Sequence, residues 1–194
     1  MDKLSSNQRL IVAISGASGA VYGISALRML KRAGIESHLV ISKAAALSLS
    51  AETDLSLSDV QGLADVVYRP GDIGAAVASG SFRTLGMLVA PCSIKTLSEI
   101  TTGVTSSLIS RAADVCLKER RRLVLMVRES PLHLGHLRSM AAVTEMGAIV
   151  APPVPAFYTR PQSLDEMVDQ SVARALDLFD IDTDMKRWGE DAHL

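Results

Sequence analysis

Residues 10–20 read LIVAISGASGA, and this stretch decides the fold. The apolar run Leu10 to Ser15 has no polar alternation, which predicts a strand buried on both faces, and a glycine turn follows it directly. Ala20 to Arg32 is predicted to form a helix that stops at Gly34, and Ser37 to Ile41 is predicted to form a second buried strand. Because a helix connects them, we expect these two strands to pair in parallel.

The same alternation of apolar strands and helices continues along the chain. Short strands are predicted at Met87 to Ala90, Leu123 to Val127 and Ala148 to Val150. Helices are predicted from near Ser93 and over Leu164 to Phe179. We therefore expect an α/β fold, a three-layer open parallel sheet of the Rossmann or flavodoxin-like kind.

Composition sets the class of protein. The chain has 194 residues, of which 48% are hydrophobic, so we expect a single domain over residues 1–194 with a polar C-terminal tail from about residue 182. With 20 basic and 21 acidic side chains, no overall field draws it to nucleic acid or to an anionic membrane. No apolar run approaches the roughly 20 residues of a membrane-spanning helix, and Cys92 and Cys116 form no short-spaced pair. These features predict a cytoplasmic protein.

The first loop is a candidate ligand site, because ligands of open α/β sheets bind beyond the carboxyl ends of the strands. Its backbone N–H groups and a serine hydroxyl at a helix N-terminus can hold a phosphate or a carbonyl oxygen, although tight strand–helix packing explains the glycines equally well. The spacing Gly16, Gly19, Gly23 departs from G-x-G-x-x-G. The second strand also ends at Ser42 and Lys43 rather than at an acidic residue, which favours a mononucleotide over NAD.

A second candidate loop is Pro91-Cys-Ser-Ile-Lys-Thr96, which begins a helix with hydroxyls, a lysine and backbone donors. Plain helix capping by Ser93 is the alternative interpretation. Cys92 is predicted to be a small buried side chain, since no histidine is placed with it by a recognisable pattern.

Charged residues gather in two later places. A segment from Arg111 to Arg122 is predicted to be helical and largely solvated, with Arg111 and Lys118 on one helix face, where both could point toward a phosphate. Arg128 and Glu129 follow a buried strand, where a ligand contact and a structural ion pair are both open.

The histidines predict no metal site. His133 and His136 are three residues apart and could share a metal, but no carboxylate or cysteine nearby completes a recognisable ligand set. His38 and His193 are predicted to be a packing residue and a solvent residue.

Taken in order, several segments resemble the UbiX-type flavin prenyltransferases over nearly the whole chain. They are Gly16-Ala-Ser-Gly19, Ser42-Lys43, Pro91-Cys-Ser-Ile-Lys-Thr96, Arg111-Ala-Ala-Asp114, Leu117-Lys-Glu-Arg120, Arg128-Glu129, His133-Leu-Gly-His-Leu137 and Pro155-Ala-Phe-Tyr158. The resemblance implies an enzyme that attaches a dimethylallyl group from dimethylallyl monophosphate to N5 and C6 of reduced FMN. The product, prenylated FMN, would serve a partner decarboxylase of the UbiD type, in ubiquinone synthesis or aromatic acid decarboxylation.

The resemblance also implies roles for individual residues. FMN would contact Gly16, Ala17, Ser18, Ser42, Ser93, Ile94, Lys95, Thr96 and Arg128. The prenyl phosphate would contact Lys118, Arg128, Glu129, Tyr158 and Arg174. Ser18, Glu129, Lys118 and Arg111 would be catalytic, and no metal would be needed, in keeping with the lack of a D-D-x-x-D pattern.

The resemblance implies a homododecamer built from trimers with sites at subunit junctions. An FMN carrier, a direct aromatic acid decarboxylase and a flavin-dependent cysteine decarboxylase are the alternatives, although the histidine and asparagine motifs of the last are not evident.

Overall fold

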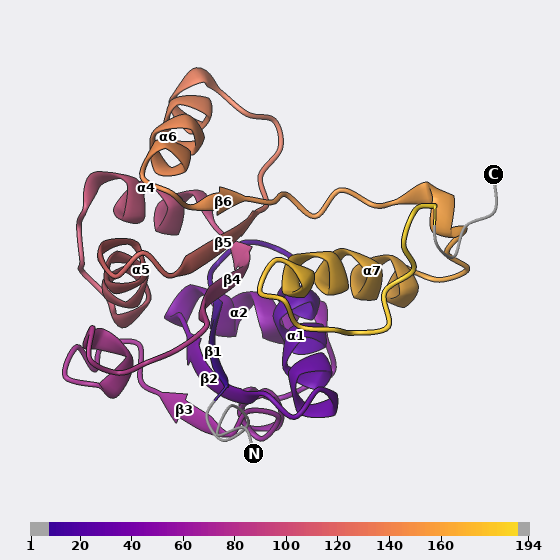
Figure 1. The fold of residues 1–194 in the computed structure, drawn as a ribbon, viewed down its shortest axis with the longest axis horizontal. Helices are drawn as coiled ribbons and strands as arrows, with labels where there is room; N and C mark the ends of the chain where they lie inside the picture. Colours follow the sequence, from indigo (N-terminus) through magenta and orange to yellow (C-terminus); the bar gives the residue numbers. More distant parts are fainter. Residues whose placement is uncertain (1–7, 190–194) are drawn as a thin grey trace, which may run out of the picture.

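The structure, a computed structural model, describes residues 8–189 and contains one sheet of six parallel strands in the order β3-β2-β1-β4-β5-β6 (Figure 1). The strands are β1 (Arg9–Ile14), β2 (Glu36–Ile41), β3 (Val66–Tyr68), β4 (Gly86–Cys92), β5 (Arg122–Val127) and β6 (Ile149–Val150). The central strands β1 and β4 are buried along almost their whole length, as uninterrupted apolar runs require. The predicted open parallel sheet is confirmed.

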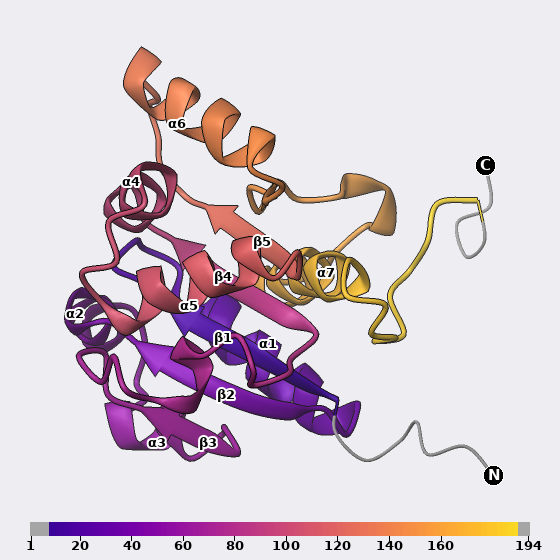
Figure 2. The same ribbon diagram turned by 60° about the vertical axis from the view of Figure 1, so that its left-hand side comes forward.

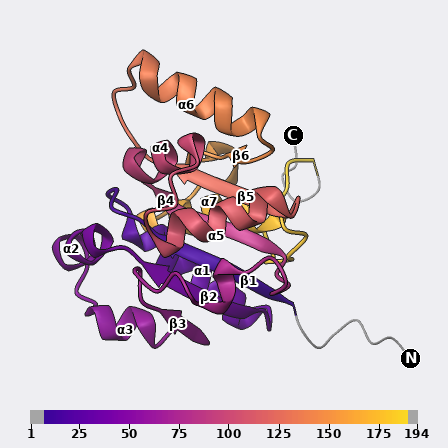
Figure 3. The same cartoon turned by 90° about the vertical axis from the view of Figure 1, so that its left-hand side faces the viewer.

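Helices cover both faces of this sheet. They are α1 (Ala20–Arg32), α2 (Lys43–Glu52), α3 (Leu57–Gln61), α4 (Ile94–Thr102), α5 (Leu108–Lys118), α6 (Leu134–Glu145) and α7 (Leu164–Asp177), with 3₁₀ turns η1 (Ala76–Ala78) and η2 (Phe157–Thr159). Alternate residues of β1 separate two cores: Leu10, Val12 and Ile14 pack with α1 and α7, whereas Ile11 and Ala13 pack with α4 and α5. Figure 2 shows α1 and α7 on one side of the strands and α4 and α5 on the other. Figure 3 shows α6 on the outer side of α4.

The strand order places the ligand crevice between β1 and β4. From β1 the chain builds outward through β2 and β3, then crosses back to β4 and builds the other half of the sheet. The loops after β1 and β4 therefore lead to opposite faces and leave a crevice at the carboxyl edge, where open sheets bind ligands.

The prediction that the charge-rich segment is helical as far as Arg122 is wrong at its end. Helix α5 stops at Lys118, and Arg120 has a left-handed φ of 57°. The Arg121 N–H bonds to Cys116 O at 2.8 Å and the Arg120 N–H bonds to Leu117 O at 3.1 Å, which is a Schellman ending. This turn reverses the chain so that β5 begins at once.

Several helices and one strand of the structure were not predicted from the sequence. The strand β3 and the helices α2, α3 and α6 were not predicted, whereas α7 begins at the predicted Leu164. His193 lies outside the described residues. Within residues 8–189, no helix is long and apolar enough to cross a bilayer.

Candidate active site

Ser15 ties the loops after β1 and β4 into one unit. Its Oγ donates to Pro91 O at 2.9 Å and accepts from the Ser93 N–H at 2.7 Å. The Ser15 N–H also donates to Pro91 O, at 3.2 Å. Because Ser15 is only 1% exposed, these bonds satisfy a buried hydroxyl and fix the spacing of the two loops.

The N-terminus of α1 holds a carboxylate from another helix. Gly19, with φ 105°, precedes α1 and supplies no side-chain cap. Instead, Glu52 at the end of α2 accepts from the Gly19 N–H at 2.8 Å and the Ala20 N–H at 3.2 Å, and Ser18 adds a side-chain hydrogen bond. In this structure the donors at the N-terminus of α1 are therefore bound by a carboxylate of the protein itself.

Several groups keep Glu52 ionised. Partial burial acts to raise the pKa of its carboxyl, but the hydrogen bonds from Gly19, Ser18 and Ala20, together with the charge of Arg128, outweigh it and hold the pKa below its usual value. An ionised carboxylate hydrogen-bonded to a serine hydroxyl is able to accept a proton through that serine. Glu52 is a candidate functional residue that the sequence reasoning missed.

Arg128 joins this group from β5. Its N–H donates to Cys92 O at 3.1 Å, which places it directly beyond the carboxyl edge. A Cβ built on Gly19 would lie 2.9 Å from the Tyr22 ring and 3.5 Å from Arg128 Cδ, so the glycine keeps the space between loop and arginine clear of side-chain atoms. Glu129 is exposed beside it and accepts from the Ser130 N–H at 2.9 Å.

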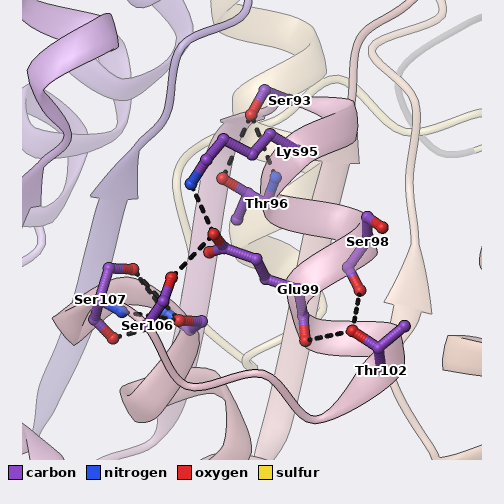
Figure 4. A network of polar contacts seen from close by, with 9 residues as sticks. Ser93, Lys95, Thr96, Ser98, Glu99, Thr102, Ser106 and Ser107 are labelled. Carbon is purple, nitrogen blue, oxygen red and sulfur yellow. Dashed lines mark hydrogen bonds and ion pairs between the residues drawn. The ribbon is translucent and has the colours of Figure 1, made fainter.

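The second loop is a capped helix start with a polar network around it (Figure 4). The Ser93 Oγ accepts from the Thr96 N–H at 3.3 Å and donates to Thr96 Oγ1 at 3.2 Å, so the helix capping that was the alternative interpretation of this loop is present. Lys95 Nζ lies 2.5 Å from Glu99 Oε1, which also accepts from Ser106 Oγ at 2.9 Å. The lysine side chain is 78% exposed and remains accessible to a ligand.

The buried thiol near this loop is inert. Cys92 is fully buried, as predicted, and burial raises the pKa of its thiol to about 12. A thiol in that state is not a nucleophile at neutral pH.

Lys118 and Arg111 lie at opposite ends of α5. Lys118 pairs with Glu119 at the C-terminus of the helix, near the start of β5, whereas Arg128 follows the end of β5. Since β5 has six residues, the two edges of the sheet are roughly 20 Å apart along that strand. Arg111 lies in the first turn of α5 and pairs with Asp114 at 2.7 Å.

Tyr158 lies on η2 and Arg174 on α7, apart from both ends of α5. Figure 1 shows the chain after β6 running out past α7 to the short turn that carries Tyr158. Tyr158 OH donates to Lys186 O at 3.3 Å, and Arg174 on α7 pairs with Asp177 at 2.7 Å. One chain thus brings together Ser18, Ser93 and Arg128, but it does not bring Lys118, Tyr158 or Arg174 to them.

The histidines take structural positions. His133 caps α6 by accepting from the Gly135 N–H at 3.0 Å, and its ring stacks on His136 with centroids 3.6 Å apart. His38 is buried, as predicted, between Tyr68 and Glu36, each at 2.9 Å. Across residues 8–189, no cluster of three or more His, Cys, Asp or Glu residues could hold a metal ion.

The fold and the site define a mononucleotide-binding protein, and the family model described as Flavoprotein matches residues 2–176. The flavin prenyltransferase UbiX of Escherichia coli K12 is 61% identical over 175 residues, covering 90% of this chain and 93% of the relative. UbiX of Thauera aromatica is 56% identical over 181 residues, covering 93% of each. The chain therefore belongs to the UbiX family of flavin prenyltransferases.

Solved structures agree with this assignment. A crystal structure of AnUbiX (PadA1) in complex with FMN and dimethylallyl pyrophosphate is 53% identical, with a TM-score of 0.93, covering 95% of this chain and 98% of that one. A dodecameric FMN-dependent UbiX-like decarboxylase from Escherichia coli O157:H7 is 46% identical, with a TM-score of 0.90, covering 93% and 99%.

Proposed function

We propose that this enzyme transfers a dimethylallyl group from dimethylallyl monophosphate to N5 and then C6 of reduced FMN. The observation that carries this proposal is the meeting of Ser18, Glu52 and Arg128 at the N-terminus of α1, beside the loop that Ser15 ties to it. A proton acceptor, a hydroxyl and a cation are the groups that such a transfer needs at the flavin edge.

The residues at the carboxyl edge fit FMN. The space beside Gly19 is one that a Cβ would enter, and Ser42 and Ser93 begin α2 and α4 with hydroxyls and helix N-termini suited to an anion. We assign FMN binding to Gly16, Ala17, Ser18, Ser42, Ser93, Ile94, Lys95, Thr96 and Arg128. When bound, reduced FMN supplies the electron-rich N5 and C6 that form bonds with the prenyl carbons.

The cationic side chains stabilise the leaving phosphate. As the allylic C–O bond breaks, its electron pair leaves with the phosphate, and Lys118, Arg128 and Arg174 balance the growing negative charge while the Tyr158 hydroxyl donates a hydrogen bond. Arg111 adds a further positive charge. This assignment needs several copies of the chain, because Lys118, Tyr158 and Arg174 lie away from Arg128 within one copy. We therefore propose a homo-oligomer with sites at subunit junctions, as a dodecamer built from trimers.

Two carboxylates handle the protons. Glu52 is held ionised and accepts, through Ser18, the proton that must leave N5 when the prenyl bond forms there. Glu129, beside Arg128, would relay a proton through the departing phosphate to the remaining prenyl double bond, and would take back the proton that leaves C6 as the second bond forms. The proposed recipient of the product is a UbiD-type decarboxylase in the same cytoplasmic compartment.

Mass spectrometry tests the reaction. The protein is incubated anaerobically with reduced FMN and dimethylallyl monophosphate, and the extracted flavin is weighed. A gain of one prenyl unit is expected, and the diphosphate should serve less well as donor. Unchanged FMN would indicate a carrier, and release of carbon dioxide from an aromatic acid without any partner would indicate a direct decarboxylase.

A further inference from the structure

The segment after α7 returns along that helix and contacts Tyr158 on η2 and Gln170 on α7. Lys186 O accepts from Tyr158 OH at 3.3 Å and from Gln170 Nε2 at 3.0 Å. The Trp188 ring meets the Tyr158 ring edge to face, with centroids 5.1 Å apart and planes at 85°. Residues 186–188, which we name the return segment, therefore hold Tyr158 from two sides.

Asp177 connects this return segment to Arg174. Its Oδ2 accepts from Arg174 Nη1 at 2.7 Å, and its Oδ1 accepts from Arg187 Nη2 at 2.5 Å. Each oxygen of one carboxylate is thus engaged by a different arginine. Because charge-assisted hydrogen bonds are short and directional, each bond fixes the orientation of its guanidinium group as well as its distance from Asp177.

The exposure of these side chains favours orientation over stability as the role of the bridge. Asp177 is 22% exposed, whereas Arg174 is 60% exposed and uses only one of its five N–H donors in this bond. Ion pairs this open to solvent contribute little to folding. The remaining donors of Arg174 are available to a phosphate while Asp177 fixes the guanidinium plane.

The charge state of Asp177 suits this role. The hydrogen bond from Arg187 lowers its pKa most, partial burial opposes that, and the charges of both arginines lower it further, so the pKa lies below its usual value. The carboxylate is ionised at neutral pH.

We propose that Asp177 is a positioning residue for the prenyl phosphate. It orients Arg174 through one oxygen and, through Arg187, anchors the return segment against which Tyr158 packs. The inference rests on the proposed function, because Arg174 and Tyr158 are the residues assigned there to the phosphate. Through Asp177, Arg174 on α7 and Tyr158 on η2 are held together in the arrangement that binds the phosphate.

Two variants break the bridge at different places. Asp177→Asn frees both arginines, whereas Arg187→Gln frees the return segment and leaves the bond between Arg174 and Asp177. Asp165→Asn is the matched control, because Asp165 is exposed in the first turn of the same helix and loses the same charge.

Steady-state kinetics at saturating reduced FMN separate positioning from chemistry. Asp177→Asn is expected to raise KM for dimethylallyl monophosphate about tenfold with kcat changed less than about threefold, as for a lost preorganised contact. Arg187→Gln is expected to raise KM by a smaller factor. The control Asp165→Asn is expected to have the KM of the wild type, and all three variants are expected to bind FMN with wild-type affinity. An unchanged or lowered KM in Asp177→Asn overturns the proposal.

Trp188, the chain's single tryptophan, reports the return segment without any turnover. Both bridge variants are expected to shift its emission to longer wavelength in the flavin-free protein, and inorganic phosphate is expected to bind about tenfold more weakly to Asp177→Asn by calorimetry. Emission and phosphate affinity equal to the wild type overturn the positioning role. Failure of the wild type to prenylate FMN overturns the proposed function instead, and leaves these two measurements to decide on Asp177.

Discussion

Replacing Glu52 by glutamine removes a charge while keeping the shape of the α1 N-terminus. Both N–H groups, of Gly19 and Ala20, donate to the same oxygen, Oε2, so one amide oxygen can accept both bonds. Because Glu52 is exposed, solvent screens its charge, and the lost interaction with the helix N-terminus costs about 0.3–1 kcal/mol of unfolding free energy. Losing a general base costs far more, about 10²–10⁴ in rate. Turnover should therefore collapse in a protein that remains folded.

The assay for Glu52→Gln measures initial rates of prenylated flavin formation beside urea unfolding. Glu145→Gln, an exposed residue at the end of α6, is the control. The pH dependence has a definite sign: the pKa of Glu52 is depressed in the folded state, so its stabilisation is present above 4.5 and is lost as the pH falls through the folded pKa. The Glu52→Gln variant should not show this loss of stability at acid pH. Turnover within about threefold of the wild type would remove Glu52 from the proton path.

Three further changes test other parts of the site. Glu129→Gln is expected to bind FMN normally and to slow prenyl transfer by about 10²–10⁴ in a single-turnover assay, and wild-type turnover would exclude it from the mechanism. Replacing Lys95 and Arg128 together by methionine is expected to weaken FMN binding by more than about tenfold in a fluorescence titration, because two charge-assisted contacts are lost, and an unchanged affinity would contradict their assignment. Gly23→Ala is expected to lower the free energy of unfolding by about 1–3 kcal/mol, since the new Cβ would lie 2.5 Å from Ile14 Cγ1 and 2.6 Å from Ala90 O, and an unchanged urea midpoint would show that α1 can move away from the sheet.

Five of the six strands were predictable because each is an apolar run beside a turn. β3 was not, since it has three residues at the edge of the sheet, and its Val67 is 40% exposed. Such a strand has no hydrophobic pattern of its own and forms by pairing with β2, as in the register His38 to Val66. The helix α6 was also missed, because Val143 is its only buried residue and its periodicity is weak.

The candidate site was predictable only where it is local in sequence. Ser93 and Thr96 are three residues apart, so their capping pattern is visible in the chain. Glu52 is 33 residues from Gly19, and nothing in the sequence near Glu52 indicates that α2 ends at the N-terminus of α1. The assignments of Tyr158 and Arg174 came from the family resemblance alone. Lys118 was also picked out by its spacing from Arg111, but the spacing does not show that the two residues lie at opposite ends of α5.

A crystal structure of the assembled protein with reduced FMN and a non-reactive prenyl phosphate analogue tests the central claim most directly. We predict that Ser18, Glu52 and Arg128 of one copy border the N5 and C6 side of the flavin, with Lys118, Tyr158 and Arg174 reaching the phosphate from neighbouring copies. A flavin bound elsewhere than the carboxyl edge between β1 and β4, or a phosphate that these basic groups do not contact, would contradict the account.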